Sequence, residues 1–507
     1  MGRRCVHHRG RLCQSARGGY DPAMAVAPPP GVPPPAARPR HAPWRTRTPV
    51  RRSRACRLGL AAGIAIYLAI LCTLSVLKHA SYHSSLIDLG IFDQVIWNTA
   101  HGRLYWDTLD PYVQAHHLFL GQHFSPGLIL LTPLYWLAPS VYTLLVAQTV
   151  SLAAAALPIY ALAARRSGDE RIALALALAY LCSPALAYVN LFDFHEIALA
   201  VPLLAWALER LDAGRPRAAV AILCLALLFK EEVGLIVAAF GLYGALAGRR
   251  PRLGAGLLTL GLGWTALVVY WAVPLLRGGP YLFDSRYQGG LLEHGHLHLA
   301  YLLHFLSPEK LAYMGWLGLP LLGLPLLGGW TALLLAPTTA YTLLSTYPNQ
   351  YDIHYHYSAP LLPLLFAGSV YGLLRLPLRA RLPLAGCVLA LVALSGWLVG
   401  PLPGEREFTQ GTYTMGPREH AIARLVALVP PGASLAVDNG MGAHLTERAW
   451  VTHFFTGSER AQALLFDLRE RSATQAKRDR AVAAILRDPH WHLVAREQGI
   501  VLYLRRP

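Results

Sequence analysis

The chain has 507 residues, of which 54% are hydrophobic and only 14% are charged. Soluble domains carry roughly 25% charged residues, so this composition excludes an ordinary soluble globular protein. The formal net charge of +17 would suggest a nucleic-acid partner, but most of it lies in the first 57 residues. We therefore expect membrane lipids, and no nucleic acid, as the partner of these basic residues.

Residues 1–56 are rich in Arg and Pro and contain neither Lys nor Glu. Such a segment cannot bury a hydrophobic core, so we expect a disordered cytoplasmic tail. Its charge can bind anionic lipid headgroups. Two alternatives stay open: the tail only fixes the orientation of the first span, or translation begins near Met24 and these residues do not belong to the protein.

Eleven blocks of mostly apolar residues follow, and a spanning helix needs about 20 such residues. They lie at 57–77, 141–164, 172–189, 196–211, 216–230, 233–248, 253–276, 313–328, 330–346, 357–374 and 382–400. With eleven spans, the tail and every later Arg cluster fall on the same side of the membrane, as the positive-inside rule requires. Residues 126–137 are apolar too, but a twelfth span there would put those Arg clusters outside. We therefore predict a re-entrant or interfacial helix at 126–137.

The remaining residues, 402–507, are more polar. An amphipathic helix is predicted at 418–429, and short strands at 434–437, 463–467 and 501–504. The fold class is therefore mainly α, a polytopic transmembrane helical bundle over 57–401 followed by a small soluble α/β domain. The topology places the N-terminus in the cytoplasm and this domain outside it.

Acidic residues are sparse in the membrane part, and most of those that could act chemically lie on the extracytoplasmic side. They are Asp88 and Asp93 after the first span, Asp193 and Glu196 in the turn Asn190–Glu196, and Glu231 and Glu232 after Lys230. Ionisable groups at membrane depth are usually functional or paired. The alternatives are that Asp88 caps a helix, that Asp93 is a solvated loop residue, and that Lys230 only pairs with Asp193 or Glu196.

Histidines fall on the same side, among them His123, His195 and His356. A divalent metal ion held by Asp88, His123 and His195 is one possibility, although no spacing matches a known metal motif and scattered loop histidines are usually unliganded. Arg286 is one of few basic residues on this side and can bind a phosphate through two hydrogen bonds. Alternatively, it anchors the chain at the interface beside neighbouring tyrosines.

Several short stretches together resemble a large bacterial family of membrane proteins of unknown function that is grouped with the GT-C glycosyltransferases. The stretches are Asp88–Gln94, His123–Pro126, Asp193–Glu196, Lys230–Glu232, Tyr355–Pro360, Pro431–Ser434 and Leu445–Arg448. The likeness covers roughly residues 60–507 and leaves out the tail. No single stretch is diagnostic, but the combination in this order is fairly specific.

The resemblance implies an enzyme of the bacterial plasma membrane that transfers a sugar from a polyprenyl-phosphate donor to a glycan, lipid or protein acceptor outside the cytoplasm. Asp88 occupies the place of the family's catalytic base or metal ligand, and Asp93 is a second catalytic candidate. Lys230 or Arg286 would stabilise the donor phosphate, with Asp193, His195, Glu196, Glu231, Glu232 and His356 as supporting polar residues. GT-C proteins often carry two adjacent acids, whereas Leu89 follows Asp88 here.

Two other functions stay open at this point, a transporter or lipid flippase and a non-catalytic assembly protein. Transporters usually show repeated halves with buried charge at the midplane. No internal repeat is visible in this chain, and its charges gather towards one end of the spans. These features favour the enzyme.

Overall fold

The computed structural model describes residues 53–109, 116–287, 292–293, 296–297, 306–454, 458–470 and 475–506. The predicted disordered tail therefore lies outside the described residues, except for its last four. Those four begin the first helix, α1 (Arg54–Ala80), three residues earlier than predicted. The helix starts there because Ser53 caps it, and its hydroxyl accepts a hydrogen bond from the Cys56 backbone N–H at 3.3 Å.

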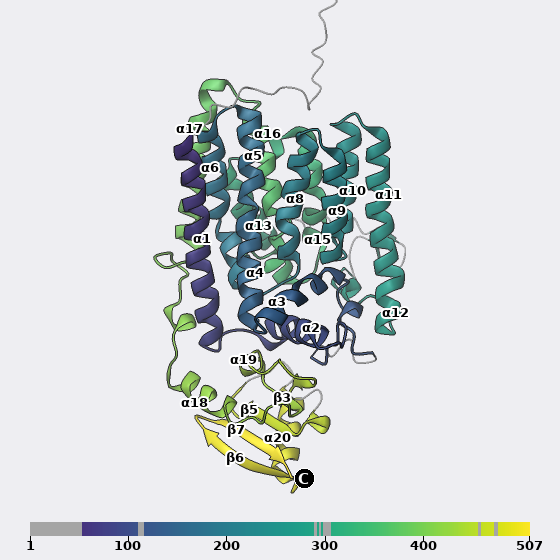
Figure 1. Ribbon diagram of the computed structural model, residues 1–507, viewed down its shortest axis with the longest axis vertical. Helices are drawn as coiled ribbons and strands as arrows, with labels where there is room; N and C mark the ends of the chain where they lie inside the picture. Colours follow the sequence, from purple (N-terminus) through teal and green to yellow (C-terminus); the bar gives the residue numbers. More distant parts are fainter. Residues whose placement is uncertain are drawn as a thin grey trace, which may run out of the picture. The chain divides into compact units, whose positions relative to one another are not determined.

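The membrane part is a bundle of helices that run side by side (Figure 1). After α1 come α2 (Ile91–Ala100), α3 (Thr132–Leu137), α4 (Val141–Ala154), α5 (Ala156–Ser167), α6 (Glu170–Leu181), α7 (Pro184–Leu191), α8 (Ile197–Asp212), α9 (Pro216–Ala226), α10 (Val233–Leu246), α11 (Pro251–Leu267), α12 (Val273–Arg277), α13 (Pro308–Gly318), α14 (Leu324–Leu327), α15 (Ala336–Leu344), α16 (Leu362–Leu373) and α17 (Leu378–Val399). A short strand pair, β1 (Leu292–Glu293) and β2 (His296–Leu297), precedes α13.

Among the residues that the structure describes, four helical segments are long and apolar enough to cross a membrane: Arg54–Ala80, Val141–Ser167, Pro251–Arg277 and Leu378–Val399. A fifth is added if α6 and α7, which meet at a 45° bend, count as one span. These segments match five of the predicted spans. Pro216–Phe229, Val233–Leu246 and Leu362–Leu373 are shorter apolar helices at predicted positions. The total of eleven spans stays a prediction.

Two predicted spans are not continuous helices. In 313–328, α13 ends at Gly318 and a left-handed turn at Leu322 and Gly323 precedes α14. Pro320 and Pro325 explain the break, because proline removes a backbone donor and clashes with the preceding turn. In 330–346, a stretch of 3-10 helix (Gly329–Leu334) comes before α15. Irregular backbone at membrane depth is tolerated where other helices cover it.

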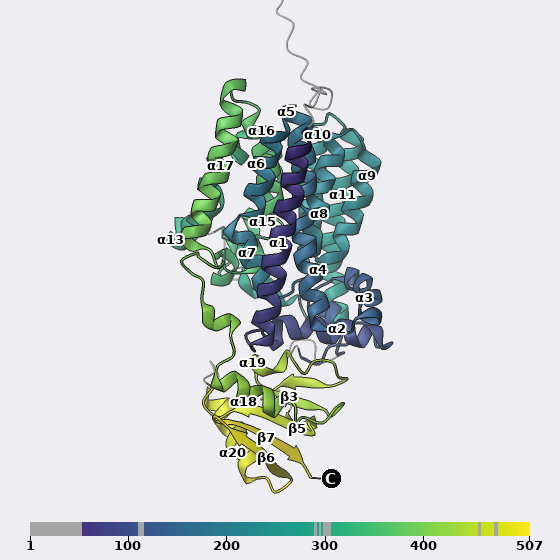
Figure 2. The ribbon, with the colours of Figure 1, turned by 60° about the vertical axis from the view of Figure 1, so that its left-hand side comes forward.

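The basic cluster of Arg165 and Arg166 lies at one end of the bundle, in ion pairs with another predicted span end. At the end of α5, Arg165 donates to Asp212 at the end of α8, at 2.9 Å, and Arg166 pairs with the same carboxylate. The Tyr371 hydroxyl on α16 also donates to Asp212, at 2.8 Å. Three predicted span ends therefore meet at one end of the bundle, and α2 and α3 lie at the other end (Figure 2).

The polar segment 78–125, which follows the first predicted span and carries Asp88 and Asp93, is partly helical. It contains a helical turn, η1 (Leu86–Gly90), that runs directly into α2. The apolar stretch 126–137 is helical as predicted, formed by η3 (Pro126–Leu131) and α3. Its Trp136 and Leu137 side chains are 69% and 84% exposed. Exposed aromatic and aliphatic side chains at this position agree with an interfacial helix.

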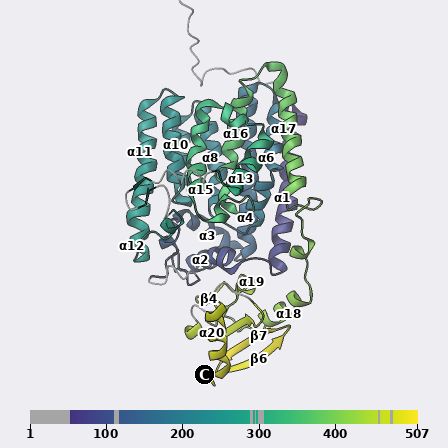
Figure 3. The same ribbon diagram turned by 180° about the vertical axis from the view of Figure 1, so that it is seen from behind.

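The C-terminal residues form a five-stranded sheet in the order β4-β3-β5-β7-β6, seen from behind in Figure 3. Its strands are β3 (Leu435–Val437), β4 (Val451–His453), β5 (Ala463–Asp467), β6 (Trp491–Glu497) and β7 (Ile500–Arg505). The helices are α18 (Pro417–Val426), α19 (Asn439–Gly442) and α20 (Gln475–Arg487). The predicted helix and three strands are confirmed; β4, β6 and α20 were not predicted. The domain limits at 401 and 402 stay a prediction.

The two faces of this sheet pack against different partners because side chains alternate along a strand. Ala436, Leu464 and Phe466 pack with Ile485 of α20. Leu435, Val437 and Leu465 belong instead to a cluster that includes α18 and the residues of η1 and α2. The second face of the sheet is therefore continuous with the core around the first external segment.

Helices α10 and α11 approach closely through glycines. A Cβ on Gly241 would lie 2.5 Å from the Leu258 backbone nitrogen, and a Cβ on Gly261 would overlap the backbone of Gly234 and Ala238. Small residues at such contacts are how helices associate in membranes, where the hydrophobic effect between helices is absent. Gly263, two residues further along α11, has open space around it.

We expect Gly261→Ala to lower the thermal unfolding temperature of the purified protein, because α10 and α11 would have to move apart. Gly263→Ala is the matched control and should be neutral or slightly stabilising, since alanine is the better helix former. Unfolding monitored by intrinsic fluorescence in detergent measures both. Equal effects of the two substitutions would contradict the close packing described above.

Candidate active site

A cavity of about 380 Å³ lies at the end of the bundle where η1 and α2 begin. Five separate parts of the chain contribute to it: η1 with α2, residues 119–123, the turn that carries His195, the segment after Tyr281, and residues 347–357. The lining residues are Ile87, Asp88, Ile91, Phe92, Phe119, Gln122, His123, His195, Leu282, Phe283, Ser285, Arg286, Tyr347, His356 and Tyr357. Five predicted site residues are therefore brought together: Asp88, His123, His195, Arg286 and His356.

The position of η1 is set by Asp193, which does not line the cavity. Lys78, in the last turn of α1, donates to the Asp193 carboxylate at 2.7 Å. The second carboxylate oxygen accepts the Ser85 backbone N–H at 2.9 Å, one residue before η1. Asp193 itself has φ = 120°, a strained conformation for a residue with a side chain. The strain persists because the ion pair and the backbone hydrogen bond hold the turn in place.

The Asp88 side chain is 29% exposed, with one oxygen 3.7 Å from Nε2 of His195. Burial, together with the charge of Asp193, raises the pKa of Asp88 to about 6. The carboxyl group is therefore charged at neutral pH but close enough to titration to accept a proton during a reaction. The alternative that Asp88 caps a helix finds no support, because it lies within the first turn of η1 and not before it.

His195 and His356 form a stacked pair behind Asp88, with ring centroids 3.6 Å apart. Burial lowers the pKa of both well below the usual value, so both rings are neutral. The His195 backbone N–H donates to the Gln148 side chain at 2.8 Å, and the same side chain donates to the Asp193 carbonyl at 2.8 Å. Gln148 on α4 thus fixes the turn that carries Asp193 and His195.

Arg286 lines the same cavity as Asp88. Its guanidinium lies over the rings of Phe283 and Tyr347, at 4.4 and 4.7 Å from their centroids. Its backbone carbonyl accepts hydrogen bonds from Thr346, which attaches this segment to the next lining segment. Within the described ranges, no carboxylate lies within ion-pair distance of this guanidinium. The contacts agree with the aromatic-anchor alternative, but they also leave the charge of Arg286 available to an anion in the cavity.

Glu231 links two of the lining segments. It pairs with His123 at 2.9 Å, and also accepts the Phe124 backbone N–H at 3.1 Å and the Tyr281 hydroxyl at 2.9 Å. Burial acts to raise its pKa, but the charge and hydrogen bond of His123 outweigh burial and lower the pKa to about 2. Glu231 is therefore ionised and holds the wall of the cavity together.

Lys230 and Glu196 are buried, Glu232 is half-buried, and none of the three lines the cavity. The Lys230 ammonium lies 3.7 Å from Glu196, as one of the alternatives proposed, while Asp193 pairs with Lys78 instead. Glu232 accepts the Tyr341 hydroxyl at 3.0 Å. Two cations were predicted to bind a donor phosphate. Arg286 lies at the cavity surface, whereas Lys230 does not line the cavity and can act on a ligand there only through its electric field.

Asp93 lies apart from Asp88. It is buried on α2, so its interpretation as a solvated loop residue is wrong. Its carboxylate accepts hydrogen bonds from the hydroxyls of Tyr135 at 2.6 Å and Thr446 at 2.5 Å. Asp93 lines a second cavity, on another side of α2. The two acids of the first external segment therefore do not share one site.

Sequence reasoning missed several residues that shape the site. Lys78 was detectable as a charged residue at the end of a span. Asn439, of the sheet domain, accepts hydrogen bonds from the Ser85 hydroxyl and the Ile87 backbone N–H, both at 3.1 Å. No sequence signal connects residues so far apart. Tyr347 and Tyr357 lie in Tyr-rich stretches whose orientation the sequence does not give.

The metal prediction gains no support from the geometry. Among the described residues, no group of three or more His, Cys, Asp or Glu side chains could hold a metal ion. His123 instead pairs with Glu231 and stacks on Phe283, with centroids 4.6 Å apart. The proposed set of Asp88, His123 and His195 therefore stays a prediction from sequence.

Comparison with known proteins identifies the family and the fold. A family model described as "Predicted membrane protein (DUF2079)" matches residues 78–502. No curated protein matches the chain. Similar solved structures include ArnT from Cupriavidus metallidurans bound to undecaprenyl phosphate, with 14% identity, a TM-score of 0.56, and coverage of 87% of this chain and 97% of that chain. The apo state of ArnT has 12% identity, a TM-score of 0.54 and coverage of 87% and 98%.

At these identities the likeness to ArnT concerns the fold alone, and it agrees with the GT-C grouping that the sequence stretches indicated. The family match covers every stretch on which that resemblance was based. The chain is therefore a member of the DUF2079 family of predicted membrane proteins, with a GT-C-like helical fold.

Proposed function

We propose that this protein is a membrane glycosyltransferase that moves a sugar from a polyprenyl-phosphate donor to an acceptor outside the cytoplasm. The observation that carries the proposal is the presence of one carboxylate and one cation in the lining of a single cavity. Asp88 and Arg286 both line it, and among the described residues neither forms an ion pair with the other. Undecaprenyl phosphate bound to ArnT, a protein of similar fold, adds support for a lipid-phosphate ligand.

The cavity supplies the two groups that this reaction needs. The Asp88 carboxylate accepts the proton of the acceptor hydroxyl as its oxygen attacks the anomeric carbon of the sugar. The bond between that carbon and the phosphate oxygen breaks at the same time, and the electron pair leaves with the polyprenyl phosphate. Arg286 stabilises the negative charge that grows on the phosphate. A single displacement of this kind inverts the configuration at the anomeric carbon.

The remaining residues position these groups. Lys78 and Asp193 hold η1, while His195 and His356 form a neutral wall that excludes water around Asp88. Ile87, which is exposed, and Leu282 both line the cavity, from two different segments. These apolar side chains suit the first isoprene units of the donor. Asp93 is assigned no part in the transfer because it lies in another cavity.

The proposal includes a location. We place the chain in the bacterial plasma membrane, with the Arg-rich end of the bundle in the cytoplasm and the cavity and the sheet domain outside it. The positive-inside rule supports this orientation, since Arg165, Arg166 and the later Arg clusters would all face the cytoplasm. The acceptor is then a glycan, lipid or protein on the outer side.

Asp88→Asn should lower sugar transfer by about 10²- to 10⁴-fold, because an amide cannot accept the proton. The assay uses the purified protein in lipid nanodiscs with a panel of polyprenyl-phosphate sugars and follows the released lipid phosphate. Asp284→Asn removes an exposed carboxylate from another lining segment and should retain activity. Equal activity of wild type and Asp88→Asn would remove Asp88 from the mechanism.

Arg286→Gln should weaken the binding of undecaprenyl phosphate by roughly 10- to 100-fold, since hydrogen bonds between charged groups contribute about 1.5–3 kcal/mol. Arg286→Lys should lose less, because the charge remains but the two-point geometry is lost. Binding to nanodisc-embedded protein measures this without knowledge of the sugar.

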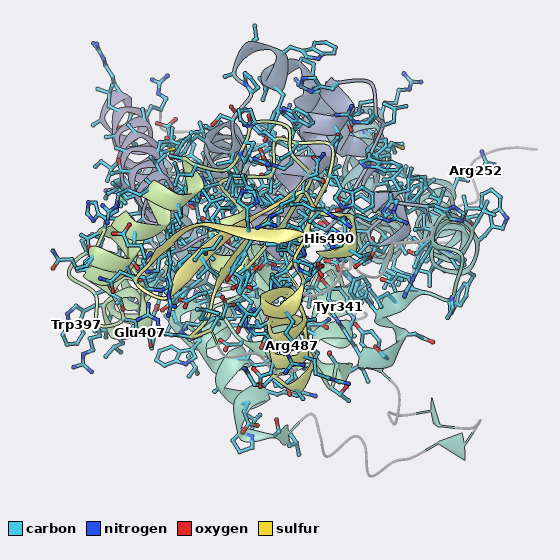
Figure 4. All side chains as sticks on the ribbon, turned by 90° about the horizontal axis from the view of Figure 1, so that it is seen from below. Arg252, Tyr341, Trp397, Glu407, Arg487 and His490 are labelled. Carbon is cyan, nitrogen blue, oxygen red and sulfur yellow. The ribbon has the colours of Figure 1, made fainter. Side chains whose placement is uncertain are left out.

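Arg406→Gln is the control, because Arg406 stacks on Trp397, at 4.3 Å from the ring centroid, outside the cavity. Trp397 lies at the edge of the view in Figure 4, next to Glu407. Wild-type protein that binds no lipid phosphate, or binds it equally well after Arg286→Gln, would argue against a lipid-phosphate donor at this site.

A further inference from the structure

A second cavity, of about 410 Å³, lies on another side of α2 from the candidate active site. The end of α1, the start of α4 and the segment 431–448 of the sheet domain complete its wall. Neighbouring residues of α2 divide between the two cavities, since Phe92 lines the first and Asp93 lines the second. The transfer reaction proposed above uses none of the side chains of this second cavity.

Two carboxyl groups line the cavity without a counter-charge. They belong to Asp93, which is 1% exposed, and Glu447, which is exposed. Partial burial and, after it, the charge of Asp93 raise the pKa of Glu447 to about 7. Within the described ranges, neither carboxylate has an ion-pair partner. Arg448 also lines the cavity, but its Nε and Nη1 groups donate to the carbonyls of Leu445 and Ala433.

An unpartnered ring nitrogen lies in the same wall. His79 is 2% exposed, and its Nδ1 atom is buried without a hydrogen-bond partner among the described residues. The cost of burying a polar atom in this way is about 1–3 kcal/mol, and a ligand that hydrogen-bonds to it would recover that cost. The ring cannot easily turn away, because it is stacked on His444, with centroids 3.9 Å apart, and meets the edge of Tyr142.

Aromatic rings form part of the same wall. Tyr142 and His444 both line the cavity, and Tyr82 packs on the far side of His444 with centroids 4.0 Å apart. Electron-rich ring faces attract cations, and Tyr is among the better rings for this interaction. Carboxylates that have no ion-pair partner among the described residues, in a wall that also contains aromatic rings, therefore favour a positively charged ligand.

We propose that this second cavity binds a small organic cation with primary ammonium groups, held by Asp93, Glu447, His79 and the ring of Tyr142. An ammonium group provides three N–H donors, which match carboxylate oxygens and a ring nitrogen. A bare metal ion fits less well, because no group of three metal-ligating side chains exists among the described residues. A neutral polyol would satisfy the hydrogen bonds but would leave both carboxylates without a counter-charge.

The cation would join the sheet domain to α2. Thr446 and Glu447 belong to the sheet domain, whereas Asp93 and His79 belong to the membrane part, and Thr446 already donates to Asp93 at 2.5 Å. An ammonium group bridging Asp93 and Glu447 would remove their mutual repulsion and strengthen this contact. The site is independent of the sugar-transfer proposal, because binding there can be measured without a sugar donor.

The test is calorimetric titration of putrescine into the full chain in nanodiscs of zwitterionic lipid, which do not themselves attract the cation. The neutral diol of the same chain length is titrated in parallel. We expect saturable putrescine binding to wild type and none of the diol. Binding should weaken about ten-fold or more in Glu447→Gln and measurably in His79→Phe, which keeps the ring stack. Glu459→Gln, which removes an exposed carboxylate elsewhere in the sheet domain, should bind like wild type.

Three results would overturn the proposal. Equal binding of the diol would make the cavity a polyol site, and putrescine binding that survives Glu447→Gln would place the cation elsewhere. Absence of putrescine binding to wild type would remove the ammonium class altogether. The unfolding temperature of Glu447→Gln without ligand is expected to be no lower than that of wild type, because the side chain is exposed and its charge opposes that of Asp93; this measurement separates lost binding from lost folding.

Discussion

The ion pair between Lys78 and Asp193 is the contact on which the candidate site depends. It joins the last turn of the first helix to a turn more than a hundred residues later in the chain. The same carboxylate receives the Ser85 backbone N–H, so the segment that carries Asp88 begins at a fixed point. Both groups are largely shielded from water, where breaking a pair by removing one partner leaves an uncompensated charge. The strained backbone of Asp193 is stable only because these contacts determine its conformation.

From this fixed point the helical turn η1 continues into α2, which forms a common wall for two cavities. One cavity is lined by Asp88 and Arg286, and the other is lined by Asp93 and Glu447. The sheet domain contacts this wall through Asn439, which binds η1, and through Thr446, which binds Asp93. Asp88 lies on η1, which continues directly into α2. A ligand that changes the contact between the sheet domain and α2 therefore acts on the helical segment that also carries Asp88. Coupling between the cavities would follow this path of direct contacts.

The charged residues near the cavity fall into two groups with different roles. Glu231 and Asp193 are buried in specific ion pairs and connect segments of the chain. Asp88 and Arg286 reach the cavity surface, and among the described residues Arg286 has no acidic partner. Burying a charged group costs free energy unless another group pairs with it. The charges of Glu231 and Asp193 are therefore used in holding the fold together. Groups that face a cavity without a close partner remain available to a ligand.

The sequence by itself determined which residues are apolar enough to cross a membrane and which polar stretches gather at one end of the spans. These follow from local composition and from the charge rule, neither of which requires knowledge of distant contacts. It also indicated the helix and three strands of the C-terminal domain through their hydrophobic periodicity. The broken helices at 313–346 were missed because their apolar composition is that of a span, while Pro320, Pro325 and the turn at Gly323 interrupt the helix.

Only the tertiary structure decided which charged residues share a cavity. Asp88 and Asp93 look equivalent in the sequence, but they are five residues apart on a helical segment, and a helix of about 3.6 residues per turn points them in different directions. Lys230 and Arg286 were equal candidates for a phosphate until the fold buried one against Glu196 and left the other at the cavity surface. Such choices depend on contacts between residues far apart in the chain, and local sequence patterns carry no information about those contacts.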